Sequence, residues 1–112
     1  MTNDINWLDI CDVSDLVEDS GVCALVDEKQ VALFYIPAET KVYALSQYDP
    51  FGQANILSRG LIGSKEGRLY VASPLYKQRF YLETGECLED EKVSLPTWKA
   101  QLVDNRVMIQ AL

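Results

Sequence analysis

The sequence predicts an all-β, mostly antiparallel fold in one domain that spans residues 1–112. Its 112 residues fit the length of about 100–150 residues that is commonest for a domain. The apolar runs are short, rich in β-branched and aromatic residues, and separated by turn-forming residues. A helical pattern is confined to a single turn near Val13–Val17, where Asp12 or Ser14 could cap the first amides.

In the first half, alternating and β-branched segments predict four strands. These are Trp7–Ile10, Val22–Val26, Val31–Ile36 and Lys41–Leu45. The second and third flank the polar residues Asp27–Gln30, which predicts a hairpin. The segment from Gln47 to Gly60 contains Pro50 and Gly52, so we expect a structured loop there, with a brief extended piece at Ile56–Leu57.

In the second half, two strands and a terminal hairpin are predicted. The strands are Arg68–Ala72 and Arg79–Leu82, joined by the loop Ser73–Gln78. Alternating apolar residues from Trp98 to Leu102 precede the turn Asp104-Asn105 and the run Arg106–Gln110. This pattern predicts an antiparallel pair at the end of the chain.

The composition argues against several classes of function. The chain has no histidine, so it cannot supply Ser-His-Asp catalysis or an imidazole metal ligand. A net charge of -7 argues against general nucleic-acid binding, which needs clustered Lys and Arg. No apolar run approaches the roughly 20 residues that span a bilayer. The polar, acidic N-terminal sequence MTNDINWLDI is unlike a secretory signal, so we expect a cytoplasmic protein.

The three cysteines are expected to be free thiols. Cys11, Cys23 and Cys87 are odd in number, widely spaced and without a CxxC pair. Cys23 lies in the apolar sequence GVCALV, which predicts a buried side chain.

Two segments together resemble the Rieske [2Fe–2S] ferredoxin fold. The first is ALSQYDPFG (44–52), which continues to Leu57-Ser58-Arg59-Gly60, and the second is VASPLYKQRF (71–80), which continues through a Thr-Gly-Glu turn. The resemblance implies a β sandwich or barrel with a smaller loop subdomain. Its cluster-binding loops would correspond to residues of about 46–60 and 72–80.

The ligand positions of that family are all changed in this sequence. Asp49 and Phe51 stand at the cysteine and histidine positions of the first loop, and Ser73 and Tyr76 stand at those of the second. A Rieske centre needs two thiolates and two imidazoles. The resemblance therefore implies a Rieske-like scaffold with no catalytic residue, no metal site and no cofactor of its own.

A Rieske scaffold with changed ligands is similar to one family, the small subunit of NAD(P)H-dependent nitrite reductase. The most specific pieces are Asp49-Pro50-Phe51, Leu57–Ile62, the run from Val71 to Phe80 and Glu89-Asp90-Glu91. This resemblance implies an accessory subunit, not catalytic alone, that supports a large subunit in reducing nitrite to ammonium. FAD, an iron–sulfur cluster and sirohaem would belong to that large subunit. The acidic net charge and the short apolar runs noted above predict no partner among nucleic acids or membranes.

The four changed positions have two interpretations. Phe51 and Tyr76 could be aromatic anchors of a docking surface. Alternatively, the four side chains could fill the space of a cluster, with Asp49 and Ser73 bonding to loop amides.

The stretch from Arg59 to Arg79 is basic in a chain that is acidic overall. It carries Arg59, Lys65, Arg68, Lys77 and Arg79 against the single acid Glu66. These cations could pair with an acidic face of the large subunit or could be solvated charges at a sheet edge. The candidate docking residues are Phe51, Arg59, Tyr76, Lys77 and Arg79.

Two other functions are weighed against the accessory subunit. A true Rieske electron carrier is opposed by the lack of histidine. A free-standing module that binds a protein or ligand with its loop tip, without redox activity, is the main alternative.

Overall fold

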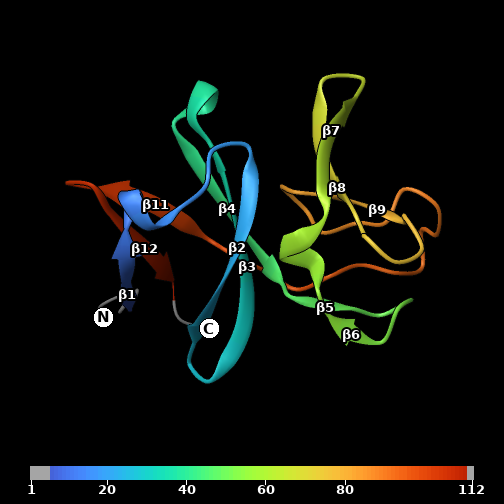
Figure 1. Ribbon diagram of the computed structural model, residues 1–112, viewed down its shortest axis with the longest axis horizontal. Helices are drawn as coiled ribbons and strands as arrows, with labels where there is room; N and C mark the ends of the chain where they lie inside the picture. Colours follow the sequence, from blue (N-terminus) through green and yellow to red (C-terminus); the bar gives the residue numbers. More distant parts are fainter. Residues whose placement is uncertain (1–5, 111–112) are drawn as a thin grey trace, which may run out of the picture.

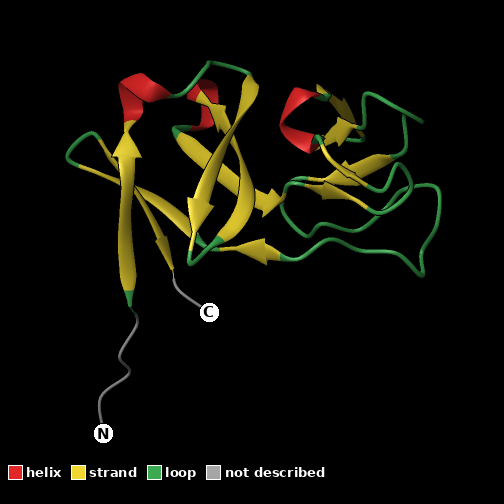
Figure 2. Ribbon diagram, turned by 60° about the horizontal axis from the view of Figure 1, so that its bottom comes forward, coloured by secondary structure: helices red, strands yellow, loops and turns green. Residues whose placement is uncertain are grey.

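The computed structural model describes residues 6–110 and consists of short antiparallel strands with three single turns of 3-10 helix (Figures 1 and 2). The strands are β1 (Trp7–Asp12), β2 (Ser20–Val26), β3 (Lys29–Ile36), β4 (Lys41–Ser46), β5 (Tyr48–Asp49), β6 (Ala54–Asn55), β7 (Leu61–Lys65), β8 (Arg68–Ala72), β9 (Arg79–Tyr81), β10 (Thr97–Trp98), β11 (Ala100–Val103) and β12 (Arg106–Gln110). The 3-10 turns are η1 (Val13–Asp15), η2 (Pro37–Glu39) and η3 (Leu57–Arg59). Within the described residues, no helix is long and apolar enough to cross a membrane.

The strands form four sheets, which lie at two ends of the molecule. One end holds a three-stranded sheet of order β1-β12-β11 and a four-stranded sheet of order β10-β4-β3-β2. The other holds the pair β5-β6 and the sheet β7-β8-β9, on the right in Figure 1. The chain passes to this end after β4 and returns through a long loop before β10.

Strand β3 is buried on both faces and separates two hydrophobic cores. Ala32, Phe34 and Ile36 face a core shared with the β7-β8-β9 sheet, where Phe80 and Val71 are fully buried. The alternate residues of β3 face a second core, which is shared with the β1-β12-β11 sheet. Since successive side chains of a strand point to opposite faces, β3 ties the two ends of the molecule together.

The prediction of an all-β, antiparallel fold is confirmed, as are the β2–β3 and β11–β12 hairpins. The predicted helical turn is η1, capped by Asp12. Several details of the sequence prediction were wrong. The extended piece of the long loop lies at β5 and β6, and Leu57 begins η3. Strand β7 was missed because glycine and serine interrupt its apolar pattern.

The terminal hairpin begins later than expected, because Thr97–Trp98 belongs to a different sheet. These two residues pair with Leu45 and Ala44 of β4, whereas Ala100 pairs with Ile109 of β12. The chain therefore changes sheets at Lys99.

The prediction that Cys23 is buried was wrong. Cys23 is exposed, as is Leu25 two residues further along β2. Strand β2 is the last of its sheet, so this part of its face is open. Cys87 is the buried cysteine, and its burial raises the pKa of its thiol.

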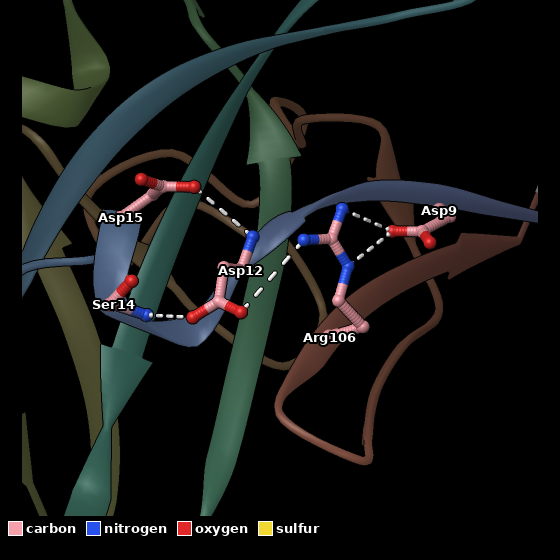
Figure 3. Close-up of polar contacts among 5 residues, drawn as sticks. All are labelled: Asp9, Asp12, Ser14, Asp15 and Arg106. Carbon is pink, nitrogen blue, oxygen red and sulfur yellow. Dashed lines mark hydrogen bonds and ion pairs between the residues drawn. The ribbon is translucent and has the colours of Figure 1, made fainter.

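A polar network fastens β1 to β12 near the start of the described chain (Figure 3). The Arg106 guanidinium donates to Asp9 at 2.9 Å and lies 3.8 Å from an Asp12 oxygen. The other Asp12 oxygen accepts from the amide of Ser14 at 2.9 Å, and Asp15 accepts from the amide of Asp12 at 3.1 Å. These bonds complete a capping box around η1.

We predict that Asp12→Ala lowers the midpoint of thermal unfolding at neutral pH, because it removes the cap of η1. The Ser14 amide, with the Arg106 guanidinium, holds the pKa of Asp12 below its ordinary value of 3.8. A carboxyl group whose pKa is lower in the folded state than in the unfolded state stabilises the fold at pH values above its ordinary pKa. This stabilisation is lost as the pH falls through the folded-state pKa. The difference between wild type and variant should therefore shrink in acid. Glu91→Ala, at an exposed position, is the control; equal midpoints for Asp12→Ala and wild type at neutral pH would contradict the prediction.

Candidate functional site at the tip of two loops

The two loops singled out by the sequence meet at the end of the molecule that holds β5 and β6. The first loop runs through β5 and β6, and the second is the segment 73–78 between β8 and β9. They are joined by Asp49 and Ser73, which are 0% and 1% exposed. Two of the four changed ligand positions therefore lie in contact inside the protein.

The Asp49 carboxylate organises both loops. One of its oxygens accepts a hydrogen bond from the Ser73 hydroxyl, and the other accepts one from the amide of Phe51 at 2.9 Å. The Ser73 hydroxyl oxygen in turn accepts the amide of Leu75 at 3.3 Å. A buried charged group is stable when several donors surround it. The carboxylate thus connects the two loops through side-chain and backbone donors.

A second buried contact fixes the base of the first loop. The Gln47 side chain donates to the Ser58 hydroxyl at 2.8 Å and to the Asn55 carbonyl at 3.2 Å. Its amide oxygen accepts the Ser58 backbone amide at 2.7 Å. Gln47 is buried, and its two bonds with Ser58 are shielded from solvent. The sequence analysis missed this pair, because nothing in the local pattern connects residues eleven positions apart.

Gly52 allows the two loops to approach closely. A Cβ atom on this residue would lie 2.8 Å from a methyl carbon of Leu75 and 3.0 Å from a carboxylate oxygen of Asp49. The Leu75 side chain therefore covers the loop junction, and a larger residue at position 52 would push the two loops apart.

The residues present do not fit a Rieske cluster. Asp49 and Ser73 form a hydrogen bond to each other, and Phe51 has no atom that can bind iron. Tyr76 carries a phenol where a Rieske centre needs an imidazole. Among residues 6–110, no group of three or more His, Cys, Asp or Glu side chains is arranged to hold a metal ion. We therefore derive no step through a cluster at this site.

The two aromatic residues at the changed positions lie in different environments. Phe51 is half-buried and packs against the first core, with its ring 6.1 Å from that of Phe80. Tyr76 is 65% exposed. Two further apolar side chains of the same loops, Tyr48 and Leu75, are also exposed. The tip therefore presents Tyr48, Leu75 and Tyr76 to solvent above a packed base.

The basic residues divide into paired and unpaired groups. Arg79 donates to Glu89 at 2.6 Å, a bond that raises the pKa of Arg79. Arg68 lies 3.7 Å from the centre of the Tyr81 ring and 4.0 Å from Glu86. In the part of the chain that the structure describes, Arg59, Lys65 and Lys77 form no ion pair. Lys77 follows Tyr76 directly, so the tip carries one unpaired cation beside its exposed apolar side chains.

Comparison with known proteins identifies the family. Residues 6–110 match the Rieske-like [2Fe-2S] domain family. The small subunit of nitrite reductase (NADH) from Escherichia coli K12 is 45% identical over 104 residues, which cover 93% of this chain and 96% of that protein. The chain belongs to the small-subunit family of NADH-dependent nitrite reductase. The predicted Rieske-like fold is confirmed.

Two other relatives extend the comparison. A crystal structure described as a putative NADH-dependent nitrite reductase small subunit from Mycobacterium tuberculosis superposes with a TM-score of 0.89 at 36% identity, and covers 96% of each chain. A stretch of the nitrite reductase [NAD(P)H] large subunit from Klebsiella oxytoca is 36% identical over 103 residues. That stretch covers 92% of this chain and makes up 11% of the Klebsiella protein.

We predict that Ser73→Ala destabilises the fold by about 1–3 kcal/mol, because the buried Asp49 carboxylate loses a donor that the surrounding protein cannot replace. Urea unfolding followed by circular dichroism measures the change. Ser64→Ala, at an exposed position of β7, is the control and should cost less than about 0.5 kcal/mol. Equal stability of Ser73→Ala and Ser64→Ala would show that the loop junction does not depend on this bond.

Proposed function

We propose that this chain is the small, non-catalytic subunit of a cytoplasmic NAD(P)H-dependent nitrite reductase. It binds the large subunit and supports the reduction of nitrite to ammonium. The observation that carries the proposal is the 45% identity to a small subunit across nearly the full length of both proteins. The FAD, iron–sulfur cluster and sirohaem of the reaction belong, in this proposal, to the large subunit.

The Klebsiella relative supports a direct association with the large subunit. There, a stretch similar to this chain is part of a protein named as a large subunit. Covalent connection holds two units at a high effective concentration. The same association between separate chains needs an interface on each of them. This favours a subunit over the free-standing binding module.

We further propose that the chain, as a single Rieske-like domain, docks through the loop tip. Tyr76 and Lys77 supply an exposed ring and an unpaired cation, and Arg59 adds a second exposed cation. Phe51 and Arg79 support this face from below through Phe80 and Glu89. Exposed aromatic side chains on a rigid base are common anchors of protein interfaces. The cations favour an acidic surface on the large subunit.

The proposed function predicts that the purified chain raises NADH-dependent nitrite reduction by its large subunit. The rate should increase with added chain and level off at a fixed ratio, since the chain acts by forming a defined complex. The measurement is NADH oxidation at 340 nm together with ammonium produced. A flat titration, with no complex on a sizing column, would contradict the proposal and favour the free-standing module.

For the docking face, we predict that Tyr76→Ala combined with Lys77→Glu weakens binding to the large subunit by about tenfold or more, since truncating an interface anchor costs about 2 kcal/mol. Isothermal titration calorimetry gives the dissociation constants. Lys92→Glu makes the same charge change at an exposed position outside the two loops and should bind as wild type. If the tip variant also binds as wild type, the tip is not the docking face.

A further inference from the structure

The β7-β8-β9 sheet has one face in the first core and one face open to solvent. Val71 and Phe80 are fully buried on the inner face. Because successive side chains of a strand point to opposite faces, their chain neighbours and the partners of these lie on the outer face. The pairing of the three strands places there Leu61, Gly63, Lys65, Arg68, Tyr70, Ala72, Arg79 and Tyr81. None of these eight residues is buried.

Two tyrosines and two arginines form the middle of this outer face. Tyr70 and Tyr81 are directly opposite each other in β8 and β9. The Arg68 guanidinium lies 3.7 Å from the centre of the Tyr81 ring, and the Arg79 guanidinium lies 5.3 Å from the centre of the Tyr70 ring. Both distances are within the roughly 6 Å over which a cation and an aromatic ring attract each other. The four side chains therefore form one ordered layer.

Gly63 lets this layer extend to the edge strand of the sheet. It is directly opposite Tyr70, and a Cβ atom on it would lie 2.6 Å from the Tyr70 hydroxyl oxygen. The far end of the Tyr70 ring therefore lies over Gly63, in space that any larger residue would need. A ring that lies along a sheet presents a broad apolar surface to a partner.

The outer face begins at the loop tip. Ala72 directly precedes the second loop and Arg79 directly follows it. Leu61 is directly opposite Ala72 and is 79% exposed, more than any other large apolar side chain among the described residues. From here the β7–β8 hairpin extends beyond β9, as Figure 1 shows. Exposed apolar side chains thus continue from the two loops onto the sheet.

The loop tip alone is small for a stable subunit interface. It presents three exposed apolar side chains and the cation Lys77. A stable interface takes about 20–30 residues from each partner, so a docking surface at the tip has to continue over a neighbouring part of the molecule. The outer face adjoins the tip directly and carries tyrosine and arginine, two residue types that are enriched among the strongest contributors to protein binding.

The charges around the outer face define the chemistry of its partner. Arg59 precedes β7 and Lys65 ends it, and neither forms an ion pair within residues 6–110. Arg68 lies 4.0 Å from Glu86, and both side chains are about half exposed or more. Against these cations, the β7–β8 turn carries the acid Glu66. The cations favour carboxylates on the partner, and the rings between them favour apolar side chains.

We propose that the outer face of β7-β8-β9 is part of the docking surface for the large subunit, with Tyr70 and Tyr81 at its centre. It takes a patch of the large subunit that combines acidic and apolar side chains. The inference rests on the proposed function, because it takes the large subunit as the partner. It deepens that function by adding a sheet face to the loop tip, and strands β8 and β9 connect the two parts directly.

Two exposed leucines provide a matched test of binding to the intact large subunit. Leu61 is 79% exposed on β7, and Leu25 is 69% exposed on β2, which is also the last strand of its sheet. Leu61→Glu and Leu25→Glu therefore introduce the same charge at comparable positions outside the cores. We expect Leu61→Glu to bind about tenfold more weakly than Leu25→Glu in isothermal titration calorimetry, a difference of about 1.4 kcal/mol. Thermal unfolding of each free variant checks that the fold is retained.

Hydroxyl-radical footprinting of the wild-type chain provides an independent measurement. Tyr70 and Tyr81 are partly exposed in the free chain, and their oxidation should slow severalfold in the complex. Unchanged oxidation of both tyrosines, or equal binding by the two variants, would overturn the outer-face proposal and leave the subunit function intact. If concentrating the chain alone protects these tyrosines, the occupant is a second copy and the proposal is wrong. If the wild-type chain forms no complex, the proposed function itself fails.

Discussion

The buried Asp49 carboxylate is the constraint on which the loop tip depends. A charge that is fully removed from solvent needs donors on every side, and here they come from the Ser73 hydroxyl and the Phe51 amide. Because these donors belong to both loops, the hydrogen bonds that stabilise the carboxylate also bring the loops together. Leu75 closes the junction over Gly52. The exposed ring of Tyr76 is thus presented by a segment whose base is held in place.

The rest of the architecture holds this tip at one end of the molecule. Strand β3 contributes side chains to both cores, so the sheets at the two ends are packed through one shared element. The change of sheets at Lys99 lets the chain pass from β10, which pairs with β4, to β11, which completes the β1-β12-β11 sheet. The proposed small subunit thus offers its partner an apolar tip, to which no redox group is assigned.

Much of the fold could be predicted from sequence because the patterns are local. The β2–β3 hairpin follows from two β-branched and aromatic runs around a polar turn, and Asp12 is one of the two caps that the sequence offered for η1. The resemblance to Rieske proteins indicated that Asp49 and Ser73 would lie near each other. Contacts without a local pattern could not be predicted: Gln47 with Ser58, the exposure of Cys23 on an edge strand, and the two-residue strands β5 and β6, which depend on tertiary bonds around Asp49.

The central claim is that hydrogen bonds and packing, rather than a bound cofactor, order the loop tip. Amide hydrogen exchange of the isolated chain, measured residue by residue after treatment with a metal chelator, tests it most directly. The account predicts that the Phe51 amide, which is bound by Asp49, and the Ser73 amide, which donates to the Gln78 carbonyl at 2.9 Å, exchange about as slowly as amides of β8. Fast exchange at both positions, slowed only when metal or the large subunit is added, would contradict it.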